Sequence, residues 1–167
     1  RDSPSYIGQG TNAYTTSQLA RYATAIATSG NVYDLTLLDR QTDSKGNTLK
    51  KYEPDIINTV DVSQNVWDDI HDGMYRVVQT HRQFDGLGVD VAGKTGTAEV
   101  NIYHPNHGMF VGYAPASDPE YAIAVRIENG YASGNACLAA DDIFKYIFEL
   151  TDEKSIPVSY THLRAHE

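Results

Sequence analysis

Three apolar runs in the second half of the sequence most constrain its fold. They lie at residues 89–100, 109–113 and 121–127. The third run alternates, with Ile123, Val125 and Ile127 on one face, as a half-buried strand requires. Loops containing Pro105-Asn106 and Ser117-Asp118-Pro119 separate the runs, and short connections between neighbouring strands favour antiparallel pairing. The pattern therefore predicts a three-stranded antiparallel meander.

An amphipathic helix is predicted near the start of the sequence, over residues 16–29. Thr15 and Gln18 have the spacing of a capping box, in which each side chain bonds a free backbone amide at the helix start. Apolar residues then follow at helical spacing. Gly30 is the natural left-handed stop for this helix.

A second helix is predicted between this segment and the strands. Asp61 or Ser63 caps it, and it ends near Thr80. Its expected apolar stripe comprises Val66, Trp67, Ile70, Met74, Val77 and Val78. Between the two helices, residues 32–39 are expected to be extended, and the turn residues at 43–47 indicate a surface hairpin.

The last amphipathic segment runs from about residue 136 to residue 150. Its inward face is expected to contain Ala140, Ile143, Phe144, Ile147 and Phe148. Two helices, three meandering strands and a final helix are typical of an α+β fold. We therefore predict a mostly antiparallel sheet with helices packed on it.

Composition excludes several classes of function. The 167 residues contain 13 Lys and Arg against 22 Asp and Glu, a formal net charge of −9, which argues against nucleic-acid binding. The single Cys excludes an internal disulfide and any multi-cysteine metal site. No run approaches the ~18 apolar residues of a membrane-spanning helix. The length is that of about one domain, and nothing in the sequence calls for a cofactor.

The segment Gly93-Lys94-Thr95-Gly96-Thr97, inside the first predicted strand, carries the most chemistry. Glycines weaken a strand unless something approaches the backbone closely. An ammonium group with hydroxyls one and three residues later suits a carboxylate ligand, and a free backbone N–H on such an edge can stabilise an oxyanion. Gly88 completes a phosphate-loop spacing with Gly93-Lys94-Thr95, but that motif opens a helix, and here β-forming residues follow.

This segment resembles the third motif of the penicillin-binding transpeptidases, and the sequence is closest to class B penicillin-binding proteins of the serine β-lactamase-like superfamily. The matching segments follow the family's order: a Gly-Gln-Gly turn at 8–10 with the helix after it, the motif at 91–99, strands at 107–115 and 125–130, and the final helix. The family more often has Trp-Phe at Met109-Phe110. The resemblance implies a partial transpeptidase-like fold.

The resemblance assigns roles to single residues. Lys94, Thr95 and Thr97 would face the cleft and bind the carboxylate of a substrate or β-lactam, and Gly96 would leave the strand open to the substrate backbone. The backbone N–H of Thr97 would form half of the oxyanion hole. Lys94 and Thr97 are thus the expected catalytic residues, with Lys94, Thr95, Gly96 and Thr97 binding substrate and no metal involved.

Two family motifs are missing from their expected positions. No Ser has a Lys three residues later, so the Ser-x-x-Lys nucleophile motif is absent. Ser-x-Asn occurs at 29–31, 63–65 and 133–135, always after the Gly-Gln-Gly turn, whereas the family has it before. We expect residues 1–150 to be the C-terminal half of a transpeptidase domain whose nucleophile lies upstream, and the isolated chain to be inactive. Residues 151–167 resemble a non-native read-through tail.

The resemblance also implies partners and a location. The parent protein would crosslink peptidoglycan stem peptides through an acyl-enzyme, and would bind β-lactams. It would be membrane-anchored on the extracytoplasmic face of the bacterial cell, with cell-wall or division machinery as partners. Two alternatives share the Lys-Thr-Gly strand: a serine β-lactamase or D,D-carboxypeptidase, and a non-catalytic penicillin-binding sensor domain.

The remaining polar candidates have simpler interpretations. His104 and His107 lie near one another but lack the further ligands of a metal site. We expect His71 to be solvated, Cys137 to be a small packing residue, and Asp141-Asp142 to lie on a solvated helix face.

Overall fold

The computed structural model describes residues 13–99 and 103–151, so the predicted Gly-Gln-Gly turn and the tail beyond Thr151 lie outside the described residues. Three helices form: α1 (Thr16–Ala27), α2 (Gln64–Gln79) and α3 (Ser133–Ile147). The main strands are β5 (Ala92–Ala98), β6 (His107–Ala114) and β7 (Tyr121–Ile127). The described residues also form four short strands and one 3₁₀ turn: β1 (Asn31–Tyr33), β2 (Arg40–Thr42), β3 (Thr48–Lys51), β4 (Ile56–Thr59) and η2 (Arg82–Phe84).

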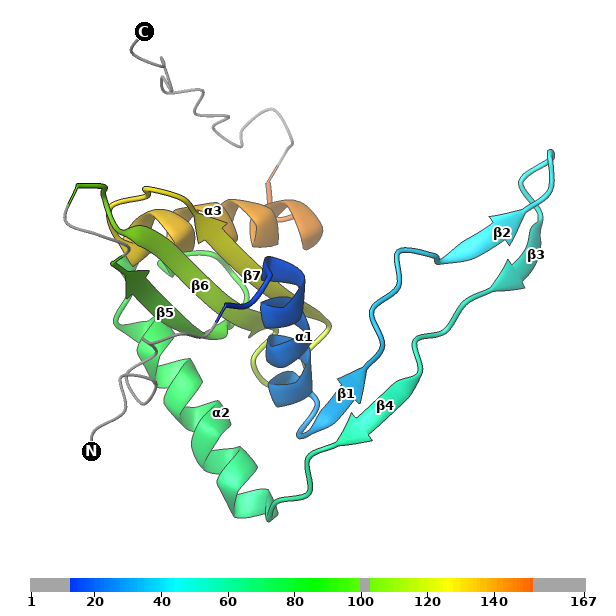
Figure 1. Cartoon of the computed structure of the whole chain (residues 1–167), viewed down its shortest axis with the longest axis horizontal. Helices are drawn as coiled ribbons and strands as arrows, with labels where there is room; N and C mark the ends of the chain where they lie inside the picture. The colour runs from blue at the N-terminus through cyan, green and yellow to red at the C-terminus, as the bar shows by residue number, and fades with distance from the viewer. Residues whose placement is uncertain (1–12, 100–102, 152–167) are drawn as a thin grey trace, which may run out of the picture.

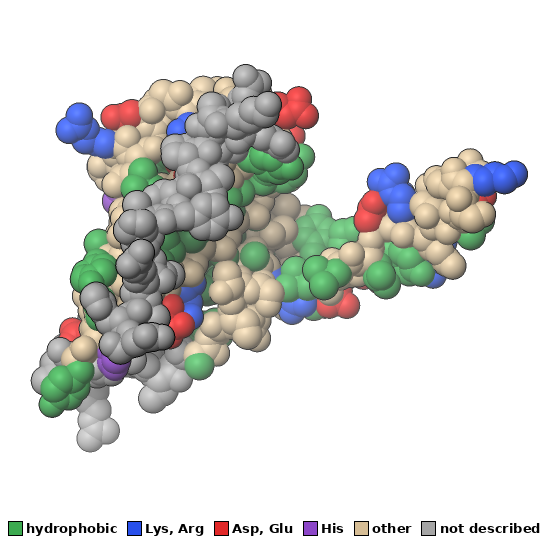
Figure 2. All heavy atoms as spheres, turned by 90° about the horizontal axis from the view of Figure 1, so that it is seen from above, with side chains coloured by type: hydrophobic (Ala, Val, Ile, Leu, Met, Phe, Trp, Pro, Cys, Tyr) green, Lys and Arg blue, Asp and Glu red, His purple; other side chains and the backbone are tan. Residues whose placement is uncertain are grey.

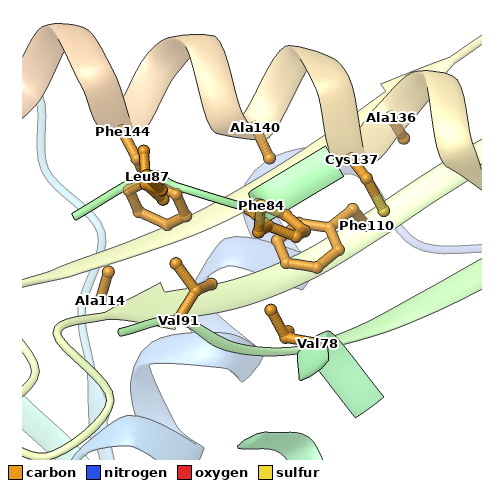
Figure 3. Packing of buried hydrophobic residues seen from close by; sticks show 10 residues of the cluster. All are labelled: Val78, Phe84, Leu87, Val91, Phe110, Ala114, Ala136, Cys137, Ala140 and Phe144. Carbon is orange, nitrogen blue, oxygen red and sulfur yellow. The ribbon is translucent and has the colours of Figure 1, made fainter. Parts of the chain in front are cut away.

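The predicted meander is confirmed as an antiparallel sheet in the order β5-β6-β7. Helices α1 and α2 lie against one face and α3 against the other, so the sheet is the middle of three layers (Figure 1). One core packs Ile26, Trp67 and Met74 against Ala92 and Tyr113 on the first face. The other core packs Phe110 and its neighbours against η2 and α3 (Figure 3).

Helix α1 begins as predicted and ends two residues early. The Thr15 amide donates to Gln18 Oε1 at 2.9 Å, and the Gln18 amide donates to Thr15 Oγ1 at 3.1 Å, which completes the capping box. Ser29 already has φ 52° and Gly30 has φ 109°, so the left-handed turn takes two residues. A Cβ at Gly30 would meet the Val60 carbonyl oxygen at 2.5 Å, which makes glycine necessary there.

The inward face of α3 differs from the prediction. Ala136, Cys137, Ala140, Asp141 and Phe144 are buried, whereas Ile143 is 41% exposed. The helix begins at Ser133, and its small residues allow close approach to the sheet along a stripe that passes through Asp141. The prediction of a solvated Asp141 was therefore wrong: Asp141 is 3% exposed and pairs with Lys145.

Helix α2 also holds a half-buried residue that was expected to be solvated. Trp67, Met74 and Val78 face inward as predicted, but Val66 is exposed. His71 lies on the buried side: its Nε2 bonds the Ile26 carbonyl of α1 at 2.8 Å. Its ring stacks on Trp67 and meets Tyr113 edge-on. The imidazole thereby links the two helices that cover this face.

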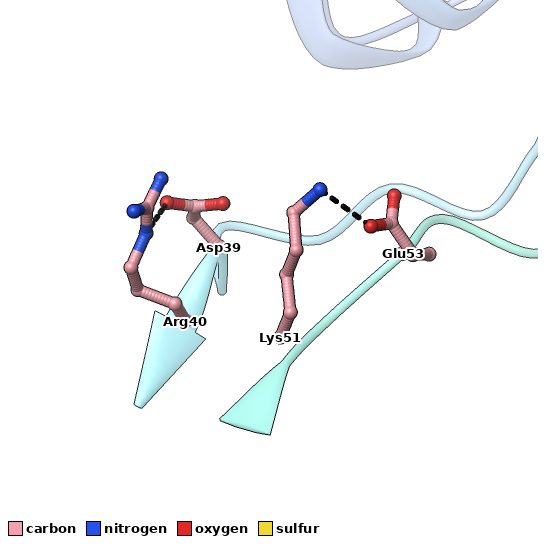
Figure 4. Close-up of polar contacts among 4 residues, drawn as sticks. All are labelled: Asp39, Arg40, Lys51 and Glu53. Carbon is pink, nitrogen blue, oxygen red and sulfur yellow. Dashed lines mark hydrogen bonds and ion pairs between the residues drawn. The ribbon is translucent and has the colours of Figure 1, made fainter. Parts of the chain in front are cut away.

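Residues 31–60 form a two-stranded arm that projects from the body (Figure 1). The predicted hairpin is confirmed as β2 paired with β3. Of the expected extended segment at 32–39, only the part in β1 forms a strand, which pairs with the unpredicted strand β4. Arg40 lies opposite Lys51. Asp39 and Glu53 offset these like charges, with ion pairs at 2.5 and 2.6 Å (Figure 4).

The arm exposes much apolar surface, which Figure 2 shows as hydrophobic side chains along its length. Leu35, Leu37, Leu38, Ile56 and Ile57 are all exposed. Among the described residues, no helix combines the length and apolarity needed to cross a membrane.

Asp141 should make the stability of the fold depend on pH. Burial raises the pKa of Asp141 above its ordinary value of 3.8, and the Lys145 ammonium only partly opposes this. A carboxyl with a raised folded-state pKa adds stability below its unfolded-state pKa, and this is lost as pH rises through the folded-state pKa. We expect Asp141→Asn to gain stability relative to the native chain as pH rises above about 4, measured by urea unfolding at several pH values.

Asp72→Asn is the matched control, because it removes a carboxylate from an exposed i,i+4 pair with Arg76. It should change the free energy of unfolding by less than about 0.5 kcal/mol across the same range. A constant difference between Asp141→Asn and the native chain at every pH would contradict the prediction.

Candidate functional site

The predicted binding segment lies on β5, which is an edge strand of the sheet. One side of β5 pairs with β6 along its whole length, from Ala92 opposite Tyr113 to Ala98 opposite His107. Among residues 13–99 and 103–151, no strand pairs with its other side. An edge strand of this kind offers backbone hydrogen-bonding groups to an extended ligand.

The sheet brings the candidate residues together along this edge but divides their side chains between its two faces. Ala92 packs against α2, so Lys94 and Gly96 share the α2 face by strand alternation. Thr95 pairs with Phe110, which packs against α3. Thr95 and Thr97 therefore lie on the α3 face.

Lys94 supplies positive charge at this edge. The side chain is exposed, and its Nζ donates to the Thr95 carbonyl at 2.6 Å. None of the ion pairs formed by the described residues involves Lys94. The charge is thus held close to the strand without a carboxylate partner, as an anion-binding group requires.

Thr97 contacts the start of α3, which the sequence did not predict. Its Oγ1 accepts a hydrogen bond at 3.2 Å from the backbone amide of Ser133, the first residue of that helix. The sequence predicted that this helix starts near residue 136, three residues after Ser133. The available signal was indirect: Gly108, directly opposite Thr97, leaves room for another segment to approach.

The glycines of β5 have different structural roles. A Cβ at Gly93 would meet the Phe110 ring at 2.4 and 2.6 Å, so packing alone requires glycine there. A Cβ at Gly96 would meet only the Met109 Cβ, at the ordinary distance of 3.6 Å. No packing contact among the described residues explains Gly96, whereas a ligand approaching the edge would.

The other candidates do not form a second site. Among the described residues, no three His, Cys, Asp or Glu side chains gather as a metal site would require. His107 accepts a hydrogen bond at Nδ1 from the Asn129 amide at 3.0 Å. Cys137 is fully buried, which confirms its packing role, and burial raises its pKa to about 11.

The phosphate-loop interpretation is excluded by the backbone. Lys94 and Thr95 lie in the middle of β5, and the chain continues as strand through Ala98. No helix opens at this point, so no helix N-terminus is available to bind a phosphate there.

Comparison with known proteins agrees with this arrangement. The family model described as the penicillin binding protein transpeptidase domain matches residues 3–149. The peptidoglycan D,D-transpeptidase MrdA of Acinetobacter baumannii is 33% identical over 159 residues, covering 84% of this chain and 23% of that protein.

Two solved structures have the same fold over most of the chain. The D,D-transpeptidase domain of a peptidoglycan glycosyltransferase from Eggerthella lenta superposes with a TM-score of 0.71 at 33% identity, covering 81% of this chain and 32% of that chain. Penicillin-binding protein A from M. tuberculosis, solved as a ceftriaxone acyl-enzyme complex, superposes with a TM-score of 0.73 at 26% identity, covering 87% of this chain and 34% of that chain.

The antiparallel sheet between helical layers and the Lys-Thr-Gly-Thr sequence on its edge strand place the chain in the class of penicillin-binding domains. The chain belongs to the penicillin-binding protein transpeptidase domain family, and its relatives are class B penicillin-binding proteins. It spans about a quarter of the length of MrdA and about a third of the solved chains.

The two glycines of β5 should respond differently to substitution. Gly93→Ala should cost about 1–3 kcal/mol of unfolding free energy, because the new methyl group collides with the buried Phe110 ring. Gly96→Ala should change it by less than about 1 kcal/mol. Urea unfolding followed by circular dichroism measures both, and equal losses would contradict a role for Gly96 outside packing.

Proposed function

We propose that this chain is the C-terminal part, over residues 1–150, of the transpeptidase domain of a peptidoglycan D,D-transpeptidase. Three observations support a partial domain. The chain spans about a third of the solved chains it resembles. The 167 residues contain no Ser-x-x-Lys. The described sheet has three strands, whereas sheets average about five or six.

The observation that carries the proposed activity is the edge strand. Among the described residues, no carboxylate pairs with Lys94 and no packing contact requires Gly96, which leaves the edge open, while Thr97 offers a hydroxyl. These groups suit a peptide or β-lactam that ends in a carboxylate and lies along β5. The Thr97 amide would supply half of the oxyanion hole.

The chemistry would then proceed in two steps on the parent protein. The Oγ of an upstream Ser attacks the penultimate D-Ala carbonyl of a stem peptide, a C–O bond forms, and the C–N bond to the last D-Ala breaks as its amine leaves with a proton. An amine of a neighbouring stem then attacks the ester carbonyl, a C–N bond forms, the C–O bond to Ser breaks, and the Ser oxygen takes up the proton that the amine loses. A β-lactam would acylate the same Ser by opening its ring.

The names of the relatives favour this activity over the alternatives. MrdA is named as a peptidoglycan D,D-transpeptidase, and penicillin-binding protein A was solved as an acyl-enzyme with ceftriaxone. A β-lactamase, a D,D-carboxypeptidase or a sensor domain would share the edge strand, but no observation favours them. Because peptidoglycan is outside the membrane, the parent protein would act on the extracytoplasmic face, where membrane anchoring and cell-wall or division machinery partners would suit its work.

The first test is covalent labelling. The gene extended upstream should encode Ser-x-x-Lys and then Ser-x-Asn before residue 7, and fluorescent penicillin should label the full-length protein with a bond that survives denaturation. The isolated chain should remain unlabelled because it lacks the nucleophile. Absence of the two motifs, or labelling of the isolated chain, would refute the proposal.

The second test concerns Lys94. In the full-length protein, Lys94→Gln should lower the second-order rate constant for acylation by penicillin about tenfold to a hundredfold, since a charge-assisted hydrogen bond is worth ~1.5–3 kcal/mol. The control is Lys50→Gln on the arm, where the ammonium lies over the Tyr52 ring. The proposed role of Lys94 in binding the carboxylate is refuted if both substitutions change the acylation rate constant equally.

A further inference from the structure

The Thr97 hydroxyl receives a backbone hydrogen bond from outside its own sheet. The Ser133 amide donates to Thr97 Oγ1 at 3.2 Å, across 36 residues of sequence. Ser133 is the first residue of α3, so its N–H has no acceptor within the helix. This amide can therefore donate a hydrogen bond to a side chain of β5.

The approach of α3 to β5 depends on a glycine in β6. Gly108 lies opposite Thr97 in the register. A Cβ at Gly108 would meet the Ala132 carbonyl oxygen at 2.4 Å. Only a residue without a side chain lets the segment before α3 lie this close to the sheet, and this closeness brings the Ser133 amide within reach of Thr97.

The loop between β7 and α3 is itself fixed to the sheet. The Asn129 amide donates to His107 Nδ1 at 3.0 Å, and Asn135 Nδ2 donates to the Gly130 carbonyl at 2.8 Å. Asn129 and Tyr131 have φ values of 53° and 64°, which cost free energy for residues other than glycine. A backbone held this firmly presents the Ser133 amide in one orientation.

We propose that the Ser133 backbone amide is a positioning group that orients the Thr97 hydroxyl as a hydrogen-bond donor to the carboxylate of the ligand. A hydroxyl has one proton and two lone pairs. With one lone pair engaged by the amide, its proton remains available for an anion. Accepting a hydrogen bond also polarises the O–H group, and the N-terminus of α3 adds positive potential.

This inference rests on the proposed function, and it deepens the assignment of Thr97. It also explains why a hydroxyl on the α3 face can act together with Lys94, whose side chain lies on the opposite face. The ligand would meet an ammonium from one side of the edge strand and an oriented hydroxyl from the other.

The test replaces the Ser133 N–H by an ester oxygen in the full-length protein, using the α-hydroxy analogue of alanine at position 133. Its matched control is Ser133→Ala, which has the same side chain and retains the N–H. The readout is the ratio of acylation rate constants for penicillin and its methyl ester, which has no carboxylate. The ratio does not depend on the fraction of folded protein.

The ester backbone should lower this ratio about threefold to tenfold relative to Ser133→Ala, since a neutral hydrogen bond is worth ~0.5–1.5 kcal/mol. In a Thr97→Val background the same backbone change should have no further effect, because coupled groups are not additive. The same backbone replacement at Gln64, the first residue of α2, should leave the ratio unchanged.

The outcomes separate the two proposals. If penicillin fails to acylate the wild-type parent, the proposed function is overturned. The positioning role of Ser133 then falls with it, because there is no ligand carboxylate for Thr97 to bind. If acylation occurs but the ester backbone changes both rate constants equally, or changes neither, the positioning role of Ser133 is overturned while the function stands. An effect that persists with Thr97→Val also overturns it, because the amide would then act by another route.

Discussion

The packing of the Phe110 ring is the constraint on which the rest of the structure depends. The ring occupies the space that side chains at Gly93 and Gly112 would need, and it also contacts Phe84 with a centroid separation of 5.2 Å. One buried ring therefore joins β5, β6 and η2 on the face covered by α3. Because the two glycines admit the ring from neighbouring strands, the register of β5 against β6 follows from packing as well as from backbone hydrogen bonds.

The candidate site inherits its rigidity from this core. The strand enters the core at Ala92 and Gly93, which are buried, and leaves it at Lys94, which is exposed. The chemistry-bearing residues are thus the direct continuation of a strand whose first half cannot shift. Gly108 performs a similar function on β6, since its missing side chain lets the start of α3 reach Thr97. Gly93 and Gly108 therefore shape the site because a side chain at either position would collide with its neighbours. Gly96 differs from both, because a Cβ there would make only an ordinary contact.

Local patterns in the sequence predicted what local physics determines. The capping box of Thr15 and the alternation in β7 each depend on a few neighbouring residues, so both could be predicted from the sequence. Contacts between segments that are distant in the sequence could not be predicted in this way. The burial of Asp141, the bond from His71 to the Ile26 carbonyl and the bond from Ser133 to Thr97 each depend on how two elements approach. β4 was missed for the same reason, because its partner β1 lies at the other end of the arm's sequence.

The division of Lys94 and Thr97 between opposite faces limits where a ligand can bind. A ligand lying on either face of the sheet would meet only one of the two groups, because side chains three residues apart on a strand point to opposite faces. A ligand can reach both groups together from the edge of β5 that pairs with no described strand, in the plane of the sheet, where the strand also presents its backbone. Under the proposed function, such a site would bind and orient an extended, anion-terminated molecule. It accelerates a reaction only if another part of the protein brings a nucleophile to the same edge, because binding substrate and transition state equally does not raise the rate of the chemical step.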